Sequence, residues 1–237
     1  MEKILYFFIL FMMYSFLGWI VETFEIFITK GKIVNRGFFI GPYCPIYGVG
    51  LILITSLLKN YTDSIIVLFI LSIFICMTLE YLTSYVMEKW FHARWWDYSD
   101  TKFNLNGRIC LETTIPFGLG GVFIMYIVHP FLTGLLNNLS SKTIIILGTI
   151  LFLIFLIDAI VSFFVISKIN KIDTSKYKDD TEEVNKKIKE YLKKTSPLMK
   201  RLLESFPNAR IKISKIKNTL EDKRDKVVKK IKSKKKK

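Results

Sequence analysis

Long apolar stretches separated by short polar segments fill the first 167 residues of the chain. A helix needs about 20 consecutive apolar residues to cross the core of a bilayer, and most of these stretches reach that length. The pattern predicts membrane spans over residues Ile4–Thr29, Tyr43–Leu58, Ser64–Phe91, Leu111–Leu136 and Thr143–Ser167. The second stretch is shorter and rich in glycine, so we expect it to be tilted, broken or partly re-entrant.

Charge divides the chain at the end of the fifth stretch. Residues 1–167 contain ten basic and ten acidic residues, so the whole formal net charge of +15 lies in residues 168–237. A soluble domain would show shorter apolar runs interrupted by charge. We therefore predict an all-α fold: a polytopic membrane helix bundle of five transmembrane helices over residues 1–167, followed by a helical, basic cytoplasmic tail over residues 168–237.

The distribution of lysine and arginine predicts the orientation of the bundle. The loops over residues 30–42 and 92–110 each hold several basic residues, whereas the other two loops hold one lysine each, Lys59 and Lys142. Cytoplasmic loops carry an excess of lysine and arginine. This places both basic loops and the tail in the cytoplasm and the N-terminus outside.

The first two helical hairpins resemble each other in sequence. Each has a carboxylate in its first helix, an arginine beside glycine and asparagine in its loop, and a proline near the start of its second helix. The matching pairs are Glu22 and Glu80, Arg36 and Arg108, and Pro45 and Pro116. They predict a parallel repeat about an axis along the membrane normal, with chance similarity as the alternative. We expect both prolines in the first turn of a helix, where the missing N–H costs nothing.

Charged residues inside or beside the spans predict a polar, substrate-binding site at the cytoplasmic face. The candidates are Glu22, Arg36, Glu80, Arg108, Asp97, Glu112 and Asp158. Carboxylates within a bilayer face the bundle interior or water, and they are paired or protonated. We expect the two arginines of this set to pair with Glu22 and Glu80, with the other carboxylates beside them. The alternative is a structural lock, in which the same ion pairs hold the loops under the bundle.

Enzymatic chemistry has no visible support in the sequence. It contains no nucleophile–base set, no HExxH motif and no Walker motif, so we expect no catalytic residue and no cofactor. Cys44, Cys110 and His92 could meet as zinc ligands, but they lack the spacing of a zinc site. We expect them to pack at helix ends instead, and we predict no metal site.

The tail has the pattern of amphipathic helices. Between residues 182 and 206 the apolar positions recur at helical spacing, and Pro197 divides them into two short helices. A second apolar stripe begins at Ile213 amid lysines, and the sequence ends with Lys234–Lys237. A basic amphipathic segment beside a membrane favours anionic lipid as its partner. We expect lipid rather than nucleic acid, which charge alone would also permit.

Several strings of residues resemble those of one bacterial family. They include Ser15-Phe16-Leu17-Gly18-Trp19, Asn35-Arg36-Gly37-Phe38, Gly41-Pro42-Tyr43-Cys44-Pro45 and Trp95-Trp96-Asp97-Tyr98-Ser99. Together they are similar to the ABC-transporter type IV permeases over roughly residues 10–165, and Phe206-Pro207-Asn208 in the tail adds to the resemblance. The resemblance implies a multi-pass protein of the bacterial cell membrane that acts in transport, and an ATPase subunit is a possible partner.

Three functions are therefore open at this point. The first is a transporter permease or a permease-like component with a polar site at the cytoplasmic face. The second is a membrane scaffold or sensor whose basic tail binds anionic lipid or a protein partner. The third is a membrane enzyme that modifies lipid headgroups. The sequence names neither a substrate nor an oligomeric state.

Overall fold

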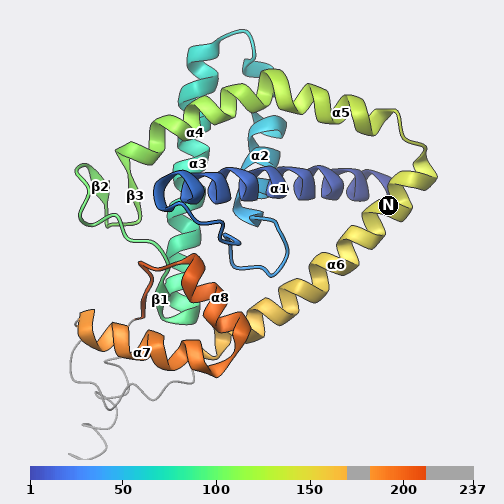
Figure 1. Cartoon of the computed structure of the whole chain (residues 1–237). Helices are drawn as coiled ribbons and strands as arrows, with labels where there is room; N and C mark the ends of the chain where they lie inside the picture. Colours follow the sequence, from blue (N-terminus) through green and yellow to red (C-terminus); the bar gives the residue numbers. More distant parts are fainter. Residues whose placement is uncertain (170–181, 212–237) are drawn as a thin grey trace, which may run out of the picture.

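The computed structural model describes residues 1–169 and 182–211, which form a helical protein (Figure 1). The bundle consists of α1 (Glu2–Lys30), α2 (Pro45–Leu57), α3 (Ile65–Phe91), α4 (Leu111–Phe123), α5 (His129–Asn137) and α6 (Ser141–Ser167). A 3-10 turn covers Lys59–Tyr61, and a π-helical segment, Ile124–Val128, joins α4 to α5. The predicted all-α class is confirmed.

The apolar helices make this a membrane-embedded protein. Within residues 1–169 and 182–211, four helical stretches are long and apolar enough to span a membrane: α1, α3, α6 and the continuous run Leu111–Asn137. Helix α2 has 13 residues and is therefore about 20 Å long, short of a bilayer core of about 30 Å. The segment before it, residues 31–44, is not helical. The expected fifth span is thus a short helix with an irregular entry.

Local sequence signals set the helix ends. Helix α1 ends at Gly31, whose positive φ of 65° suits a left-handed cap. Ser64 and Ser140 accept hydrogen bonds from the first turns of α3 and α6, as N-cap serines do. Pro45 occupies the first turn of α2, as predicted.

The same expectation is wrong for Pro116, which lies inside α4. This helix begins earlier, at Leu111, because Cys110 has an extended backbone at the N-cap. The hydroxyls of Thr113 and Thr114 both donate to the carbonyl of Cys110, which supports this early start. Pro116 then leaves one carbonyl of α4 without its usual donor.

Small residues allow the helices of each hairpin to approach closely. A Cβ atom added to Gly48 of α2 would lie 2.2 Å from the Ser15 Oγ of α1. A Cβ atom on Gly121 of α4 would lie 2.3 Å from the Ser72 Oγ of α3. Glycine at these two positions therefore serves helix packing, which is typical of membrane proteins.

The described part of the tail packs onto the bundle. It forms α7 (Glu182–Thr195) and α8 (Pro197–Ser205), divided at Pro197 as predicted, at the C-terminal ends of α3 and α6 (Figure 1). Strand β4 (Arg210–Ile211) pairs antiparallel with β1 (Ala93–Arg94), directly after α3. We call this end of the bundle, where loops 31–44 and 92–110 meet residues 182–211, the tail end.

The apolar stripe of the tail is part of a protein core rather than a free face. Its buried members, each at most 6% exposed, are Ile188, Leu192, Met199, Leu202, Leu203 and Phe206. They pack with Phe91, Trp95 and Ile166 of the bundle. Helix α6 ends at Ser167, where the sequence predicts the domain boundary, yet this core joins both sides of it. The second stripe from Ile213 and the Lys234–Lys237 run lie outside the described residues.

Candidate functional site

The segment before α2 enters the bundle and is held there by Asp158. The backbone N–H groups of Ile40 and Gly41 donate to the Asp158 carboxylate at 2.9 and 2.7 Å, and the Tyr43 hydroxyl donates to it as well. Asp158 lies nine residues before the end of α6, about 14 Å along the helix. Irregular backbone at such a depth is tolerated where the protein satisfies its polar groups. Asp158 therefore stabilises the irregular segment over residues 31–44.

Glu22 of α1 forms the ion pair with Arg36 that the sequence predicts. The Arg36 Nε lies 3.0 Å from Glu22 Oε2, and the Tyr47 hydroxyl of α2 donates to Glu22 Oε1 at 2.7 Å. Arg36 also donates to the carbonyl of Ser205, and its guanidinium lies 4.7 Å from the centre of the Phe206 ring. This arginine thus connects α1 to the end of α8.

Arg201 of α8 extends this connection. It donates to the carbonyls of Asn35 at 3.4 Å and Phe38 at 3.1 Å, and the Ser205 hydroxyl donates to Asn35 at 2.6 Å. Burial lowers the pKa of the Arg201 guanidinium, and the negative charge of Asp158 opposes that effect. Asp158 binds residues 40 and 41 of the same segment. The segment before α2 is therefore held by the carboxylate of Asp158 and the guanidinium of Arg201.

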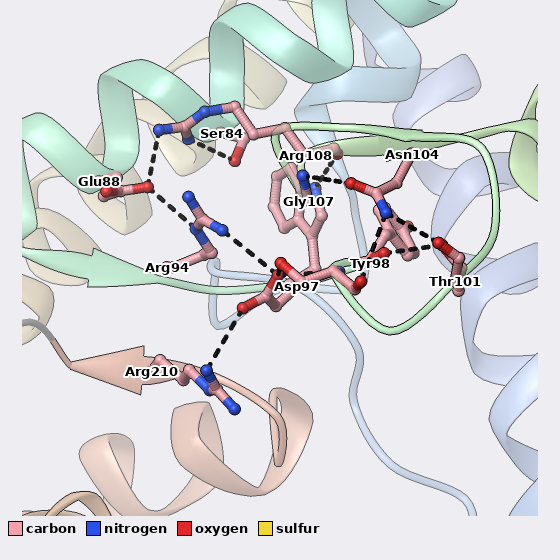
Figure 2. Close-up of polar contacts among 12 residues, drawn as sticks. Ser84, Glu88, Arg94, Asp97, Tyr98, Thr101, Asn104, Gly107, Arg108 and Arg210 are labelled. Carbon is pink, nitrogen blue, oxygen red and sulfur yellow. Dashed lines mark hydrogen bonds and ion pairs between the residues drawn. The ribbon is translucent and has the colours of Figure 1, made fainter. Parts of the chain in front are cut away.

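A second network, drawn in Figure 2, joins α3 to the loop over residues 92–110. Arg108 donates to Glu88 at 2.8 Å and to the Ser84 hydroxyl at 2.9 Å, so its guanidinium binds two acceptors on α3. Arg94 lies between Glu88 and Asp97, at 3.1 and 3.3 Å. Arg108 and Glu88 are both at least 92% buried. Breaking a pair as buried as this leaves an uncompensated charge, which costs several kcal/mol.

Asp97 anchors the loop and also contacts the tail. It accepts hydrogen bonds from the backbone and the hydroxyl of Ser99 at 3.1 and 2.5 Å, and Arg210 approaches its other oxygen at 3.9 Å. Burial opposes the charge of Asp97, but the bonds from Ser99 and the charge of Arg94 outweigh it and hold its pKa below the usual range. Gly107 has φ 65° and passes so close that a Cβ atom there would lie 2.5 Å from an Asp97 oxygen.

Glu80 lies deeper in the bundle than this network. It is eleven residues before the end of α3, about 16 Å along the helix, and it is 7% exposed. Its Oε1 accepts a hydrogen bond from the Tyr98 hydroxyl at 3.2 Å. Its Oε2 is buried and has no hydrogen-bond partner among the described residues. Burial raises the pKa of Tyr98, so this hydroxyl keeps its proton.

The structure brings most of the predicted site residues to the tail end, but in a different pairing. Arg36 pairs with Glu22 as expected, whereas Arg108 binds Glu88 rather than Glu80. The reason is the loop between β2 (Asn104–Leu105) and β3 (Ile109–Cys110), a short hairpin that places Arg108 beside Ser84. Glu112 is exposed in the first turn of α4, outside these networks.

Several residues of the two networks were not predicted as site residues: Tyr47, Glu88, Arg94, Tyr98, Arg201, Ser205 and Arg210. For Glu88 a signal existed, because Cys76, Glu80, Ser84 and Glu88 recur every four residues on one face of α3. For the tail residues the sequence carries no such signal. Among residues 1–169 and 182–211, no three His, Cys, Asp or Glu side chains are placed to hold a metal ion.

The fold and these networks define a polytopic membrane protein with a charged, largely buried cluster at one end. A comparison with family models identifies it further. The chain belongs to the family described as "Putative ABC-transporter type IV", whose model matches residues 9–163. No curated protein and no solved structure matches the chain.

Proposed function

We propose that this protein is the membrane-embedded permease component of a transport system, and that its tail end faces the cytoplasm and contains the polar site. The observation that carries the proposal is the irregular segment before α2, which Asp158 holds inside the bundle. Transporters form their substrate sites at discontinuous helices, where irregular backbone and helix N-termini face the pathway. Here α2 is short and begins at Pro45, directly after the irregular segment.

Family membership supports the same function, since the family is described as related to ABC transporters. An ABC permease needs an ATPase subunit, and the described part of this chain is a membrane bundle with a short helical extension. We propose that such a subunit binds at the tail end, where the networks of α1, α3 and α6 meet α7 and α8. Movement of the tail would then reach the irregular segment before α2 through Arg36 and Arg201.

The test is to purify the tagged full chain from its native membranes in mild detergent. A stoichiometric ATPase subunit with a Walker motif should accompany it, and its ATP hydrolysis in proteoliposomes should depend on this protein. Asp158→Asn removes the charge that holds the N–H groups of Ile40 and Gly41. The rate of ATP hydrolysis in proteoliposomes should therefore differ between this variant and the wild-type protein. Tyr191→Ala, at a side chain 65% exposed on α7, is the control and should leave that rate unchanged.

The ABC permease would be excluded if no ATPase subunit co-purified. It would also be excluded if ATP hydrolysis were the same with Asp158→Asn and Tyr191→Ala as with the wild-type protein. The scaffold or sensor would then be favoured, provided that vesicles of anionic lipid retain the full chain. The apolar stripe over residues 182–206 is covered by the bundle, so it is not free to insert into the lipid. That the protein is not an enzyme remains a prediction.

A further inference from the structure

Glu80 differs from the other carboxylates that take part in the polar networks of the bundle. Glu22, Glu88 and Asp158 are each held by an arginine or by several hydrogen-bond donors. Glu80 receives one hydrogen bond, from Tyr98, and its second oxygen is buried without a partner among the described residues. The salt bridges of residues 1–169 and 182–211 all go to other carboxylates.

The groups around Glu80 among the described residues do not supply the missing positive charge, since Arg108, which donates to Ser84 one turn further along α3, is paired with Glu88. Those that interact with it electrostatically are Tyr98 of the loop, Cys76 of its own helix, Tyr47 of α2 and Glu22 of α1. Three of these are neutral at physiological pH, and the fourth is a carboxylate. A like charge nearby disfavours ionisation of a carboxyl group.

The cost of a charge at this position favours the neutral group. A buried carboxylate without a cation costs far more than a buried hydroxyl, so the group takes up a proton instead. An ionisable residue inside a membrane bundle is commonly part of a proton or ion pathway. Glu80 has both features, since it is 93% buried and sits about 16 Å from the end of its helix.

We propose that the Glu80 carboxyl is a proton-binding site inside the bundle, reached from the tail end through Tyr98. The Tyr98 hydroxyl contacts Glu80 Oε1, while its backbone N–H binds the carbonyl of Gly107 in the loop. When the loop moves, water enters from the tail end and accepts the proton of Glu80, and water or a cation then stabilises the carboxylate. Such a site would supply a coupling ion for transport, but the proposal concerns the titration of Glu80 and does not depend on the proposed function.

The experiment is infrared difference spectroscopy of the full chain in lipid nanodiscs while the pH of the buffer is changed across neutrality. The wild-type protein should lose a protonated-carboxyl C=O band as the pH rises. Glu80→Gln should abolish that band, because it removes the carboxyl group. Glu112→Gln is the control: it removes an exposed carboxyl group of the bundle that lies outside both networks, and it should keep the band.

Tyr98→Phe gives a second test that retains the carboxyl group. The tyrosine hydroxyl favours the charged form of Glu80, so its loss should shift the midpoint of the band upward by about one pH unit, the size expected for one hydrogen bond to a carboxylate. This variant decides the matter if Glu80→Gln does not fold. A wild-type spectrum without the band, a band that survives Glu80→Gln, or a midpoint unchanged by Tyr98→Phe would overturn the proposal.

Discussion

Phe206 is one of the buried side chains that attach the tail to the bundle, and replacing it with alanine should loosen the tail. It is 6% exposed, stacks on Phe38 with ring centres 4.5 Å apart, and meets the edge of Trp95 at 5.5 Å. The guanidinium of Arg36 lies over its ring. Truncating a buried phenylalanine to alanine costs about 3–5 kcal/mol. Opening of the tail should therefore become at least about 100-fold more frequent, since 1.4 kcal/mol is a factor of ten.

Amide hydrogen exchange of the full chain in nanodiscs measures this opening directly. The most informative amide is that of Ile211, which donates to the Asn185 side chain at 2.8 Å and sits in strand β4. Its exchange should accelerate about 100-fold in Phe206→Ala, together with the amides of α8. Amides in the middle of α3 should be unaffected, because the membrane helices keep their own hydrogen bonds.

Tyr191→Ala is the matched control for this prediction. It also removes an aromatic ring from the tail, but that ring is 65% exposed on α7. Surface substitutions of this kind usually change stability by less than about 0.5 kcal/mol. If Phe206→Ala and Tyr191→Ala give equal exchange at Ile211, Phe206 does not hold the tail and the reasoning from its contacts is wrong.

Three further predictions concern the loop network and the orientation of the bundle. Arg108→Lys should lower the thermal stability by about 1–3 kcal/mol, because an ammonium cannot serve both buried acceptors, while Lys102→Ala on the exposed loop should leave the melting temperature unchanged. The folded-state pKa of Asp97 is depressed, so its contribution to stability is present above its unfolded pKa of about 4 and is lost as the pH falls through the folded value; thermal unfolding against pH should show this acid-side loss, and Asp97→Asn should remove it. Cysteines introduced at Asn60 and Asn137 should react with an impermeant reagent from outside intact cells, and labelling from the cytoplasm alone would refute the predicted orientation.

The sequence predicts the helices of the bundle well because their formation is a local matter. Runs such as Ile65–Phe91 and Ser141–Ser167 are apolar over their whole length, and serine caps begin both helices. Glycine and proline likewise predict that the chain before α2 is irregular. What holds that segment is different in kind, since Gly41 and Asp158 are 117 positions apart and no local pattern relates them.

The pairing of Arg108 with a carboxylate of α3 is likewise something that a local sequence pattern cannot predict. The four-residue spacing of Glu80, Ser84 and Glu88 predicts that they share one face of α3. Which of the two carboxylates Arg108 reaches depends on the short hairpin of the loop, where Asn106 and Gly107 both have positive φ. The direction in which such a turn sends the next side chain is a tertiary property.

The tail shows that amphipathicity predicts a helix but not its partner. The apolar spacing of residues 182–206 is equally compatible with a lipid surface and with a protein core. Additional polar groups decide between them, because Arg201 and Ser205 find carbonyl acceptors in loop 31–44 that a bilayer could not offer. The family-like string at Phe206 marks the same contact, although its meaning becomes visible only when Phe38 lies against it.

The two interpretations of the charged cluster, a lock and a site, apply to different members of it. Glu22, Glu88 and Asp158 each bind a partner from a loop, so neutralising any of them should lower stability and activity together. Glu80 has no arginine partner among the described residues and accepts one hydrogen bond, from the Tyr98 hydroxyl of the loop, which the carbonyl of a glutamine could also accept. Glu80→Gln should therefore keep or raise the melting temperature while it abolishes any proton-dependent activity. If Glu80→Gln instead lowered both stability and activity, the result expected in part for Arg108→Lys, Glu80 would belong to the structural lock.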